Sequence, residues 1–213
     1  MAVSLTLFTA LGVLWVVGAA PSIHWLDSSE LACAACTLGI SHPPGQIPHA
    51  ILGGLLSILP LGDCAFRVTL LSVGASWAAL SAAWIWLGKA VDESHRQSWT
   101  VAVLLSGSAL SGLISTQAVR GEVYGLSAAL TLAAIALCHC RGDARFRGLA
   151  WLAWGLSALN HPVISLAALP FLAGRGCVQW LGFGILPALG LLYLPLRAAA
   201  KAAWNFGNPM DGE

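Results

Sequence analysis

The chain has 213 residues, of which 58% are hydrophobic and only 9% are charged. Because about 25% of the residues of a soluble domain are charged, this composition and a mean hydropathy of +0.79 exclude an ordinary soluble domain. The net charge of +1 offers no basic surface of the kind that binds nucleic acid, which excludes nucleic acid as a partner. The chain is therefore expected to be an integral membrane protein in contact with the lipid bilayer.

Apolar runs long enough to enter a membrane recur along the chain. A hydrocarbon core about 30 Å thick is crossed by roughly 20 apolar residues in a helix. The first run, 2–20, has no Lys or Arg before it and is followed by Pro21, so we interpret it as an uncleaved anchor. Four further runs of this kind are 65–88, 98–118, 123–140 and 177–195.

Two regions depart from the simple membrane-helix pattern. The apolar stretch 148–173 is interrupted by Asn160-His161-Pro162, which predicts two short helices that meet at the break. Residues 21–64 form a long first loop, in which Ser41-His42-Pro43-Pro44-Gly45 predicts a turn. The apolar stretch 49–59 within this loop predicts a helix that lies along the membrane interface.

These elements predict an all-α, polytopic membrane protein with about seven transmembrane or membrane-embedded helices. We expect residues 1–213 to form a single domain that is part of a longer protein. Residues 21–64 are expected to be its first extracytoplasmic loop.

Basic residues suggest the orientation. A cytoplasmic amino terminus places the loops at 89–97, 141–147 and 174–176 inside, where the cluster of Arg141, Arg145 and Arg147 in a short loop favours retention. Polar residues from distant segments then share the outer face. They are Asp27, Glu30, His42, His49, Arg67, Arg120, Glu122, Tyr124, His161, Arg197 and Trp204. Because ionisable groups are costly in lipid, they are expected to line a wet cavity, which is a candidate functional site.

The six cysteines lack the spacing of a secreted disulfide framework, so most are interpreted as small buried hydrophobic residues. Cys33-x-x-Cys36 resembles a redox or metal spacing, but it lies in an apolar helix without a second pair, which favours core packing. Cys138-His139-Cys140 receives no role, because three ligands from one tripeptide rarely give tetrahedral geometry.

The acidic pair Asp27 and Glu30 opens an apolar helical stretch. Their spacing places both carboxylates on one helical turn, where they could share a proton, a metal or a substrate hydroxyl. The same spacing is a capping box, with Asp at the N-cap and Glu three residues later, and that role requires no function.

Histidines and arginines complete the set of candidate residues. His42 and His49 flank the Pro-Pro-Gly turn and are candidate metal ligands, acid/base groups or phosphate contacts, or are simply solvated. Arg67, Arg120 and Arg197 could neutralise a lipid phosphate, and the alternative is pairing with nearby carboxylates or lipid headgroups.

The run 21–31, which contains the acidic pair, and the run 38–45, which contains the Pro-Pro-Gly turn, resemble the family called domain of unknown function 2723. That family includes the transmembrane protein 260 O-mannosyltransferases. Further similarities occur in the family's order, at Phe66-Arg67-Val68, Glu122-Val123-Tyr124 and Asn160-His161-Pro162. The resemblance spans nearly the whole chain, with departures at Ser29, Thr69 and 46–48.

The resemblance implies a glycosyltransferase of the GT-C type, which uses a sugar on a polyprenyl phosphate as its donor. It identifies Asp27 and Glu30 as the acidic catalytic motif and the turn from His42 to Gly45 as part of the substrate-binding loop. Other substrate-binding candidates are the polar outer residues, namely His49, Arg67, Arg120, Glu122, Tyr124, His161 and Arg197. Cofactor use stays open, with a divalent cation on Asp27 and Glu30 as one alternative.

The sequence therefore predicts transfer of a mannose-like sugar from a polyprenyl phosphate to an acceptor hydroxyl at the extracytoplasmic face. The acceptor is a protein or a glycan, and Asp27 is the general base. Two other classes remain as alternatives. One is a transporter or channel, which predicts polar residues on both faces of the membrane. The other is a catalytically silent assembly subunit.

Overall fold

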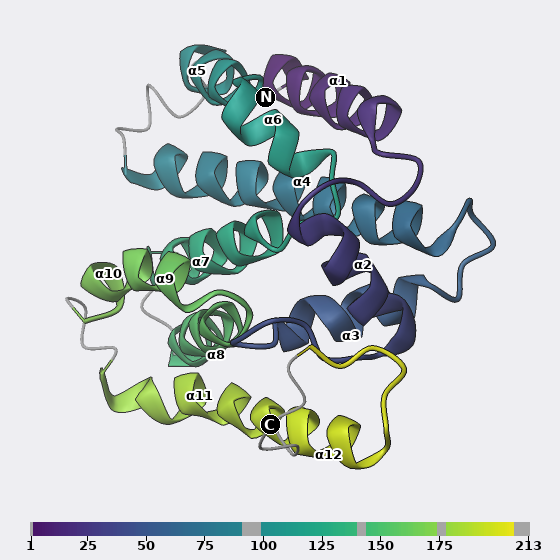
Figure 1. The fold of residues 1–213 in the computed structure, drawn as a ribbon. Helices are drawn as coiled ribbons and strands as arrows, with labels where there is room; N and C mark the ends of the chain where they lie inside the picture. Colours follow the sequence, from purple (N-terminus) through teal and green to yellow (C-terminus); the bar gives the residue numbers. More distant parts are fainter. Residues whose placement is uncertain (1, 91–98, 140–143, 174–177, 207–213) are drawn as a thin grey trace.

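The computed structural model describes residues 2–90, 99–139, 144–173 and 178–206, and it is helical apart from loops and an isolated bridge between Ile40 and Asn205 (Figure 1). The all-α prediction is therefore confirmed for these residues. The helices that build the bundle are α1 (Ala2–Gly18), α2 (Asp27–Thr37), α3 (Ile47–Leu56), α4 (Cys64–Ala90), α5 (Trp99–Ala109), α6 (Gly112–Ala118), α7 (Tyr124–His139) and α8 (Ala144–Asn160). Shorter pieces follow as α9 (Pro162–Ser165), η1 (Leu166–Ala168), α10 (Leu169–Ala173), η2 (Val178–Trp180), α11 (Leu181–Ile185), η3 (Leu186–Leu192) and α12 (Tyr193–Ala199).

Helix α7 is the centre of the bundle, because it packs on α4 along one side and on α8 along the other. Helices α1, α5 and α6 lie beyond α4, and α11 packs on the opposite side of α8 (Figure 1). The α4–α7 contact is close at Gly125, where an added Cβ would lie 2.5 Å from the hydroxyl oxygen of Ser76. Small residues at this crossing bring the first turn of α7 next to α4.

Two apolar clusters stabilise the bundle. The first lies among α1, α4, α5 and α6 around Trp15, which is 2% exposed and donates its indole N–H to Ser115. The second joins α7, α8 and α10 around Trp151 and Leu172. In a lipid environment such contacts stabilise the helices by close van der Waals packing, so they fix the relative positions of the helices that carry the site.

The membrane-span prediction is supported in part. Two helical stretches, Cys64–Gly88 and Leu181–Ala199, are long and apolar enough to cross a membrane, or three if the α5–α6 pair counts as one span. The expected single helix at 98–118 is wrong, because α5 and α6 bend by 72° where they meet. Ser111 starts the new helix as its N-cap and accepts a hydrogen bond from the Ile114 N–H, at 3.4 Å. The predicted break after Asn160 is confirmed, because α8 ends there and α9 begins at Pro162.

The first loop contains two helices and a disulfide. The predicted interfacial helix corresponds to α3, which begins two residues earlier than expected and ends at Leu56. Cys36 at the end of α2 is bonded to Cys64 at the start of α4, with 6.0 Å between their Cα atoms. The interpretation of these two cysteines as small hydrophobic residues is therefore wrong, whereas Cys138 is buried as expected, and its thiol donates to the Phe171 carbonyl at 3.4 Å. The disulfide ties the end of α2, in the middle of the loop, to the start of α4.

The predicted cytoplasmic loops lie largely outside the described residues, which leave out 91–98, 140–143 and 174–177. Within the described part, α2 and α3 lie where several helix ends meet (Figure 1). These ends are the start of α4, the end of α6, the start of α7 and the end of α8. Because successive helices alternate in direction, residues far apart in sequence gather at this end of the bundle.

Candidate functional site

The first turn of α2 presents Asp27. Leu26 precedes it in an unusual backbone conformation, with φ 63° and ψ −145°, and the Ser29 hydroxyl donates to the Leu26 carbonyl at 3.0 Å. Asp27 is thus the first residue of the helix, and no side chain caps the helix start. The capping-box interpretation is wrong, because Glu30 bonds to a distant loop instead of the backbone before the helix.

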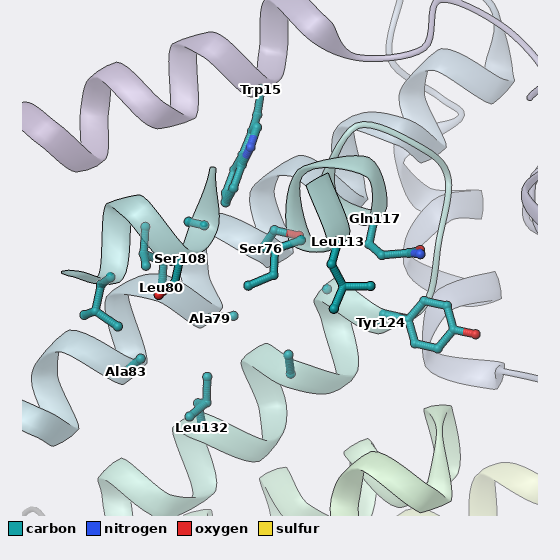
Figure 2. A pocket seen from close by; sticks show the side chains of 15 residues that line it. Trp15, Ser76, Ala79, Leu80, Ala83, Ser108, Leu113, Gln117, Tyr124 and Leu132 are labelled. Carbon is teal, nitrogen blue, oxygen red and sulfur yellow. The ribbon is translucent and has the colours of Figure 1, made fainter. Parts of the chain in front are cut away.

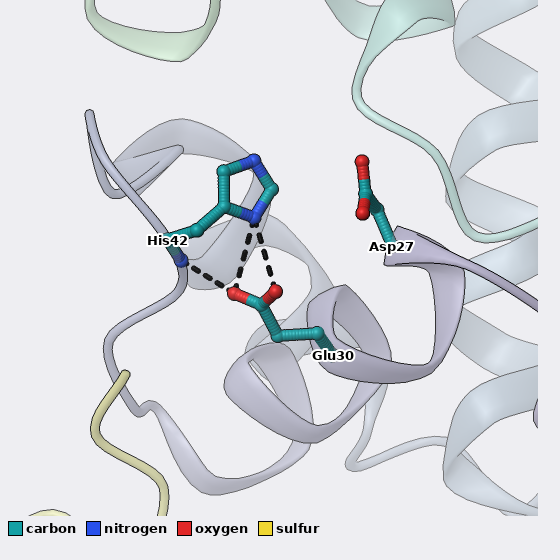
Figure 3. Close-up of side chains that lie close together, drawn as sticks. All are labelled: Asp27, Glu30 and His42. Carbon is teal, nitrogen blue, oxygen red and sulfur yellow. Dashed lines mark hydrogen bonds and ion pairs between the residues drawn. The ribbon is translucent and has the colours of Figure 1, made fainter. Parts of the chain in front are cut away.

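Glu30 binds the loop that carries His42 (Figure 3). Its carboxylate accepts the backbone N–H of His42, and both carboxylate oxygens lie 3.1 Å from the His42 Nδ1 atom. The Glu30 side chain is only 14% exposed, whereas Asp27 on the same turn is exposed and points past the imidazole ring. The two acidic residues therefore have different environments despite being three positions apart.

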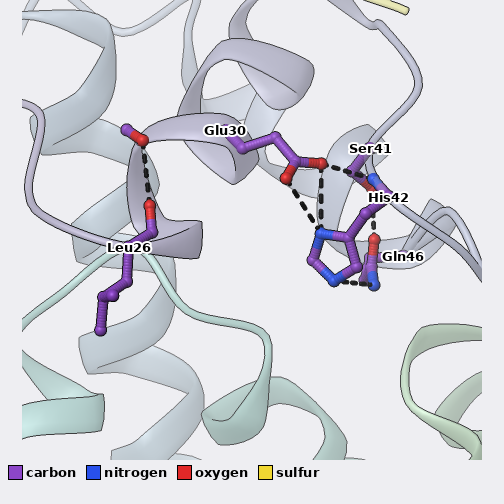
Figure 4. A network of polar contacts seen from close by, with 6 residues as sticks. Leu26, Glu30, Ser41, His42 and Gln46 are labelled. Atoms are coloured by element: carbon purple, nitrogen blue, oxygen red, sulfur yellow. Dashed lines mark hydrogen bonds and ion pairs between the residues drawn. The ribbon is translucent and has the colours of Figure 1, made fainter. Parts of the chain in front are cut away.

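The far side of the His42 ring is also bonded, which determines its preferred tautomer (Figure 4). The Ser41 hydroxyl donates to the amide oxygen of Gln46, so the Gln46 amide nitrogen faces the His42 Nε2 atom at 3.1 Å. An amide nitrogen can only donate, so Nε2 must accept. The proton of a neutral imidazole is then on Nδ1, from which it is donated to Glu30.

A cavity of about 190 Å³ opens beside this network. Its walls come from α2, the loop after it, the segment before α7 and the junction of α8 and α9. The lining residues are Asp27, Leu31, His42, Pro43, Pro44, Gln46, Glu122, Val123, Tyr124, His161, Pro162 and Val163. The volume is below the range of about 300–1,000 Å³ for drug-sized ligands, so the cavity suits a small ligand group.

Glu122 is a second carboxyl group in this cavity, and it is only 4% exposed. The Ser72 hydroxyl holds its backbone, as it donates to the Glu122 carbonyl at 2.8 Å and accepts the Glu122 N–H at 2.9 Å. Burial is the largest effect on this group and raises the pKa of Glu122; the Asp27 charge raises it as well, while Arg120 and His42 lower it. Glu122 thus holds its proton more tightly than an exposed glutamate.

His161 lines the cavity at the junction of α8 and α9. The centroid of its ring lies 5.3 Å from that of the Tyr124 ring. The His161 Nδ1 atom is buried without a hydrogen-bond partner in the described part of the chain. A buried polar atom without a partner costs about 1–3 kcal/mol, so this nitrogen is well placed to bind a polar ligand group.

Asn160, which is fully buried, holds three parts of the site together. Its amide oxygen accepts the His49 N–H at 3.1 Å, at the start of α3. Its amide nitrogen donates to the Val123 carbonyl at 3.1 Å and to the Ser127 hydroxyl at 2.7 Å. This side chain therefore sets the position of α3 relative to the segment between α6 and α7.

Several predicted substrate-binding residues lie outside this cavity. His49 is 1% exposed and does not reach it, and desolvation lowers the pKa of its imidazole to about 4. The Arg67 guanidinium donates to the carbonyls of the loop 57–63, and Arg197 donates to those of Thr37 and Leu38. Both arginines thus bind backbone carbonyls of loop and helix ends.

Two further predicted residues have supporting positions. Gly45 adopts φ 98° in the turn after the two prolines, and an added Cβ would lie 2.8 Å from Leu194, so the turn requires glycine here. Arg120 donates to the Thr116 carbonyl at 2.9 Å and is close enough to Glu122 to lower the pKa of that carboxyl.

Gln46 is the residue of the site that sequence reasoning missed. The sequence marks it only as part of the segment 46–48 that departs from the family pattern, yet it is 2% exposed, lines the cavity and binds both Ser41 and His42. Its spacing of four residues from His42 is the signal that could have identified it, because a tight turn brings such residues together.

Asp27, Glu30 and His42 have the chemistry of a cation site, because one ligand atom from each lies within 4.8 Å of the others. Two carboxylates and an imidazole suit a divalent metal. To bind such an ion through Nδ1, the His42 ring would have to carry its proton on Nε2. The hydrogen bond from Gln46 to Nε2 favours the tautomer with the proton on Nδ1 instead. A metal would therefore require a rearrangement of the network.

Together these features define a helical membrane protein with an acidic site among the loops at one end of its bundle. Residues 27–195 match the family model described as the N-terminal domain of the protein O-mannosyl-transferase TMEM260. The chain therefore belongs to this family, as the motifs of its loops predicted.

A curated relative agrees with this family assignment. The protein O-mannosyl-transferase TMEM260 of Mus musculus is 25% identical over 233 residues, a match that covers 96% of this chain and 32% of the mouse protein. The chain thus spans about a third of the length of that relative. No solved structure matches the chain.

Proposed function

We propose that this chain is the amino-terminal catalytic part of a GT-C glycosyltransferase that transfers a mannose-like sugar from a polyprenyl phosphate to an acceptor hydroxyl. The observation that carries the proposal is the division between the two acidic residues of α2. Glu30 is bonded to His42, whereas Asp27 is exposed at the cavity. The family assignment and the name of the mouse relative support the reaction class and a protein acceptor.

Asp27 is the general base of this reaction. Its carboxylate accepts the proton of the acceptor hydroxyl as the hydroxyl oxygen attacks the anomeric carbon. The bond between that carbon and the phosphate oxygen breaks, its electron pair stays on the phosphate, and the configuration at the carbon inverts. A general base contributes about 10²–10⁴-fold to the rate, so positioning and charge stabilisation must supply the remainder.

Glu30 and His42 act as positioning residues in this mechanism. The Glu30 carboxylate binds the His42 loop at both its backbone and its ring, and Gln46 holds the ring from the other side. This network fixes the loop with Pro43 and Pro44 opposite Asp27. A sugar in the cavity is then held between that loop and α2.

The donor phosphate requires positive charge or hydrogen-bond donors. Arg67 and Arg197 donate to backbone carbonyls through both Nε and a terminal nitrogen, whereas Arg120 donates to the Thr116 carbonyl through Nε. We therefore assign this role to Arg120, which is close enough to Glu122 to lower the pKa of that carboxyl, and to His161, which lines the cavity and has an unpartnered Nδ1 atom among the described residues. Glu122 in its protonated form can donate a hydrogen bond to a sugar hydroxyl.

The site is proposed to face the extracytoplasmic side. Disulfides form and persist in oxidising compartments and are rare in the cytosol. Because the Cys36–Cys64 bond joins the last turn of α2, the helix that begins with Asp27, to the start of α4, it favours a lumenal or periplasmic location for this end of the bundle. Lipid-linked sugar donors would then be used from the same side as secreted acceptors.

The test is a pair of substitutions in the full-length protein. Asp27→Asn keeps the size of the side chain and removes the carboxylate, so transfer from a polyprenyl-linked mannose should fall by at least about a hundredfold. Glu30→Gln keeps one oxygen as an acceptor for the His42 N–H and should reduce transfer less. Asp27→Asn should match the wild type in membrane insertion and unfolding midpoint. Glu30→Gln should insert but unfold at a lower midpoint, because it loses the charged acceptor of the His42 bonds. Near-normal turnover in the Asn variant would remove Asp27 from catalysis.

A further inference from the structure

Two cavities adjoin at Tyr124, and their walls differ in kind. The larger one has a volume of about 520 Å³, and all the residues that line it lie on the helices α1, α4, α5, α6 and α7 (Figure 2). One wall of the polar cavity is instead the loop 41–46, to which His42 and Pro44 belong. A loop lacks the regular backbone hydrogen bonds that hold a helix in place, so its position depends on other contacts. The shape of the polar cavity therefore depends on the residues that bind this loop.

Helix α12 binds the segment that leads into the loop. The Tyr193 hydroxyl donates to the Gly39 carbonyl at 2.9 Å. The Arg197 guanidinium donates to the carbonyls of Leu38 and Thr37, the second at 3.1 Å. Because Thr37 is the last residue of α2, its carbonyl has no partner within the helix, and a positive charge at this end is favourable. Helix α12 thus fixes the point at which the chain leaves α2 for the loop.

The chain after α12 turns back and pairs with the same segment. Lys201 has φ 53°, the left-handed conformation in which helices commonly end, and Figure 1 shows the yellow segment beyond it returning toward α2 and α3. The Ile40 N–H donates to the Trp204 carbonyl at 2.9 Å, and the Phe206 N–H donates to the Ile40 carbonyl at 3.0 Å. Gly39 allows this close approach, because an added Cβ would lie 2.3 Å from the Trp204 carbonyl oxygen.

Phe206 extends these contacts to the ring of His42. The two ring centroids lie 6.1 Å apart and the ring planes meet at 76°, an edge-to-face arrangement that aromatic rings favour. Glu30 and Gln46 already bind the two nitrogens of the His42 ring. The ring is therefore held by α2, by its own loop and by the segment that follows α12.

We call Tyr193, Arg197 and Phe206 the α12 clamp. We propose that the clamp positions the His42 loop as a wall of the sugar-binding cavity, so that substrate affinity depends on residues that do not touch the substrate. None of the residues 193–206 lines the polar cavity, so the clamp acts only through the loop. This inference rests on the proposed function, which places the sugar between that loop and α2.

The test is a matched pair of substitutions in the full-length protein. Phe206→Ala removes the contact with His42. Phe183→Ala removes the same side chain from α11, where it is 46% exposed against 48% for Phe206 and its ring contacts that of Trp180. Phe206→Ala should raise KM for polyprenyl phosphate mannose about two- to tenfold, the factor that one aromatic pair provides, and keep kcat within about twofold. Phe183→Ala should change neither value. A purely structural role would lower the unfolding midpoint of either variant without moving KM.

Hydrogen exchange provides a readout that does not depend on turnover. Tyr193→Phe removes only the hydroxyl bond to Gly39 and keeps the ring. In this variant and in Phe206→Ala, the amide hydrogens of 38–46 should exchange at least about twofold faster than in the wild type, because each variant removes one contact of the loop. Phe183→Ala should leave this exchange unchanged. Tyr193→Phe also replaces Phe206→Ala in the kinetic assay if the latter does not insert, with the same expected rise in KM.

The outcomes separate this inference from the proposed function. Unchanged exchange of 38–46 in both clamp variants would show that the clamp does not hold the loop, and the inference would be wrong. Faster exchange with an unchanged KM would also overturn it, because the clamp would then stabilise the loop without positioning the site. If the wild type does not transfer mannose from this donor, the proposed function fails, and the exchange measurement alone decides whether the clamp holds the loop.

Discussion

Replacing Asn160 tests how the site is assembled. The His49 N–H lies in the first turn of α3, where backbone N–H groups have no partner within the helix. Asn160→Ala removes the only acceptor seen for this N–H among the described residues. An unsatisfied buried donor costs about 1–3 kcal/mol, and each of the two lost bonds to Val123 and Ser127 contributes about 0.5–1.5 kcal/mol. The Val123 carbonyl keeps its bond to the Ser127 N–H. The expected cost is therefore about 3 kcal/mol.

The measurement is thermal unfolding of the full-length protein in nanodiscs, together with donor KM. A loss of about 3 kcal/mol corresponds to roughly 6–12 °C in the unfolding midpoint of a domain of this size. Donor KM should rise as well, because Asn160 aligns α3 with the segment that carries Glu122. The expected change in KM distinguishes a residue that positions the site from one that only stabilises the bundle.

The matched control is Ser157→Ala, one helical turn earlier on α8. Ser157 is also fully buried, and it bonds to Thr131 at 2.8 Å and to the Ser127 carbonyl at 3.1 Å. These contacts join α8 only to α7, so this variant should lose about 1–2 kcal/mol and keep its donor KM. Equal midpoints and equal KM values for the two variants would refute the positioning role of Asn160.

Three further outcomes follow from the site. Burial raises the pKa of Glu122, so the folded state binds the carboxyl proton more tightly than the unfolded state does. This proton binding stabilises the folded protein fully at pH values below the ordinary pKa of 4.5. The stabilisation is lost as the pH rises through the raised pKa of the folded state. Glu122→Gln should therefore show a smaller drop in unfolding midpoint between acidic and neutral pH than the wild type, and identical pH profiles would contradict this account. Cys36→Ser with Cys64→Ser opens a loop with a sequence separation of 28 and should cost about 3.5 kcal/mol, measured as the difference in midpoint from the oxidised wild type; no difference would mean that the bond does not form in the cell. Chelation of divalent cations should leave transfer within about twofold of the untreated enzyme, since His42 donates from Nδ1 in the observed network; a loss restored by added metal would assign Asp27, Glu30 and His42 as ligands.

The sequence predicted the bundle where apolar runs have the length of a membrane helix. Runs 65–88 and 123–140 became α4 and α7 with nearly the expected bounds, because burial of a continuous apolar stretch favours one helix. The break at Asn160 was readable because proline cannot continue a helix. The bend between α5 and α6 was not predicted, since its signal is only the Ser111-Gly112 pair, which single helices tolerate.

The candidate site was predicted as a neighbourhood and not as a set of contacts. Alternating helices bring loops 21–64, 119–123 and 160–162 to one end of the bundle, and the sequence was sufficient for that inference. It could not predict which charged groups reach the cavity. Arg67 and Arg197 donate to backbone carbonyls that only the folded chain places near them. The Cys36–Cys64 pairing likewise depends on the packing of α2 against α4.

The roles of Asp27 and Glu30 show why spacing alone was insufficient. Because the two residues are three positions apart on one helical turn, the sequence pattern does not distinguish their carboxylates. A capping box would account for both of them. Folding makes them different, because the loop that returns after α2 places the His42 N–H and ring on Glu30. The Glu30 oxygens are occupied by these bonds, whereas Asp27 is exposed and lines the cavity. The contacts that bind Glu30 to His42 also hold the loop opposite Asp27. If Asp27 is the base, as we propose, one network both leaves Asp27 as the available carboxylate and builds the space in which it would act.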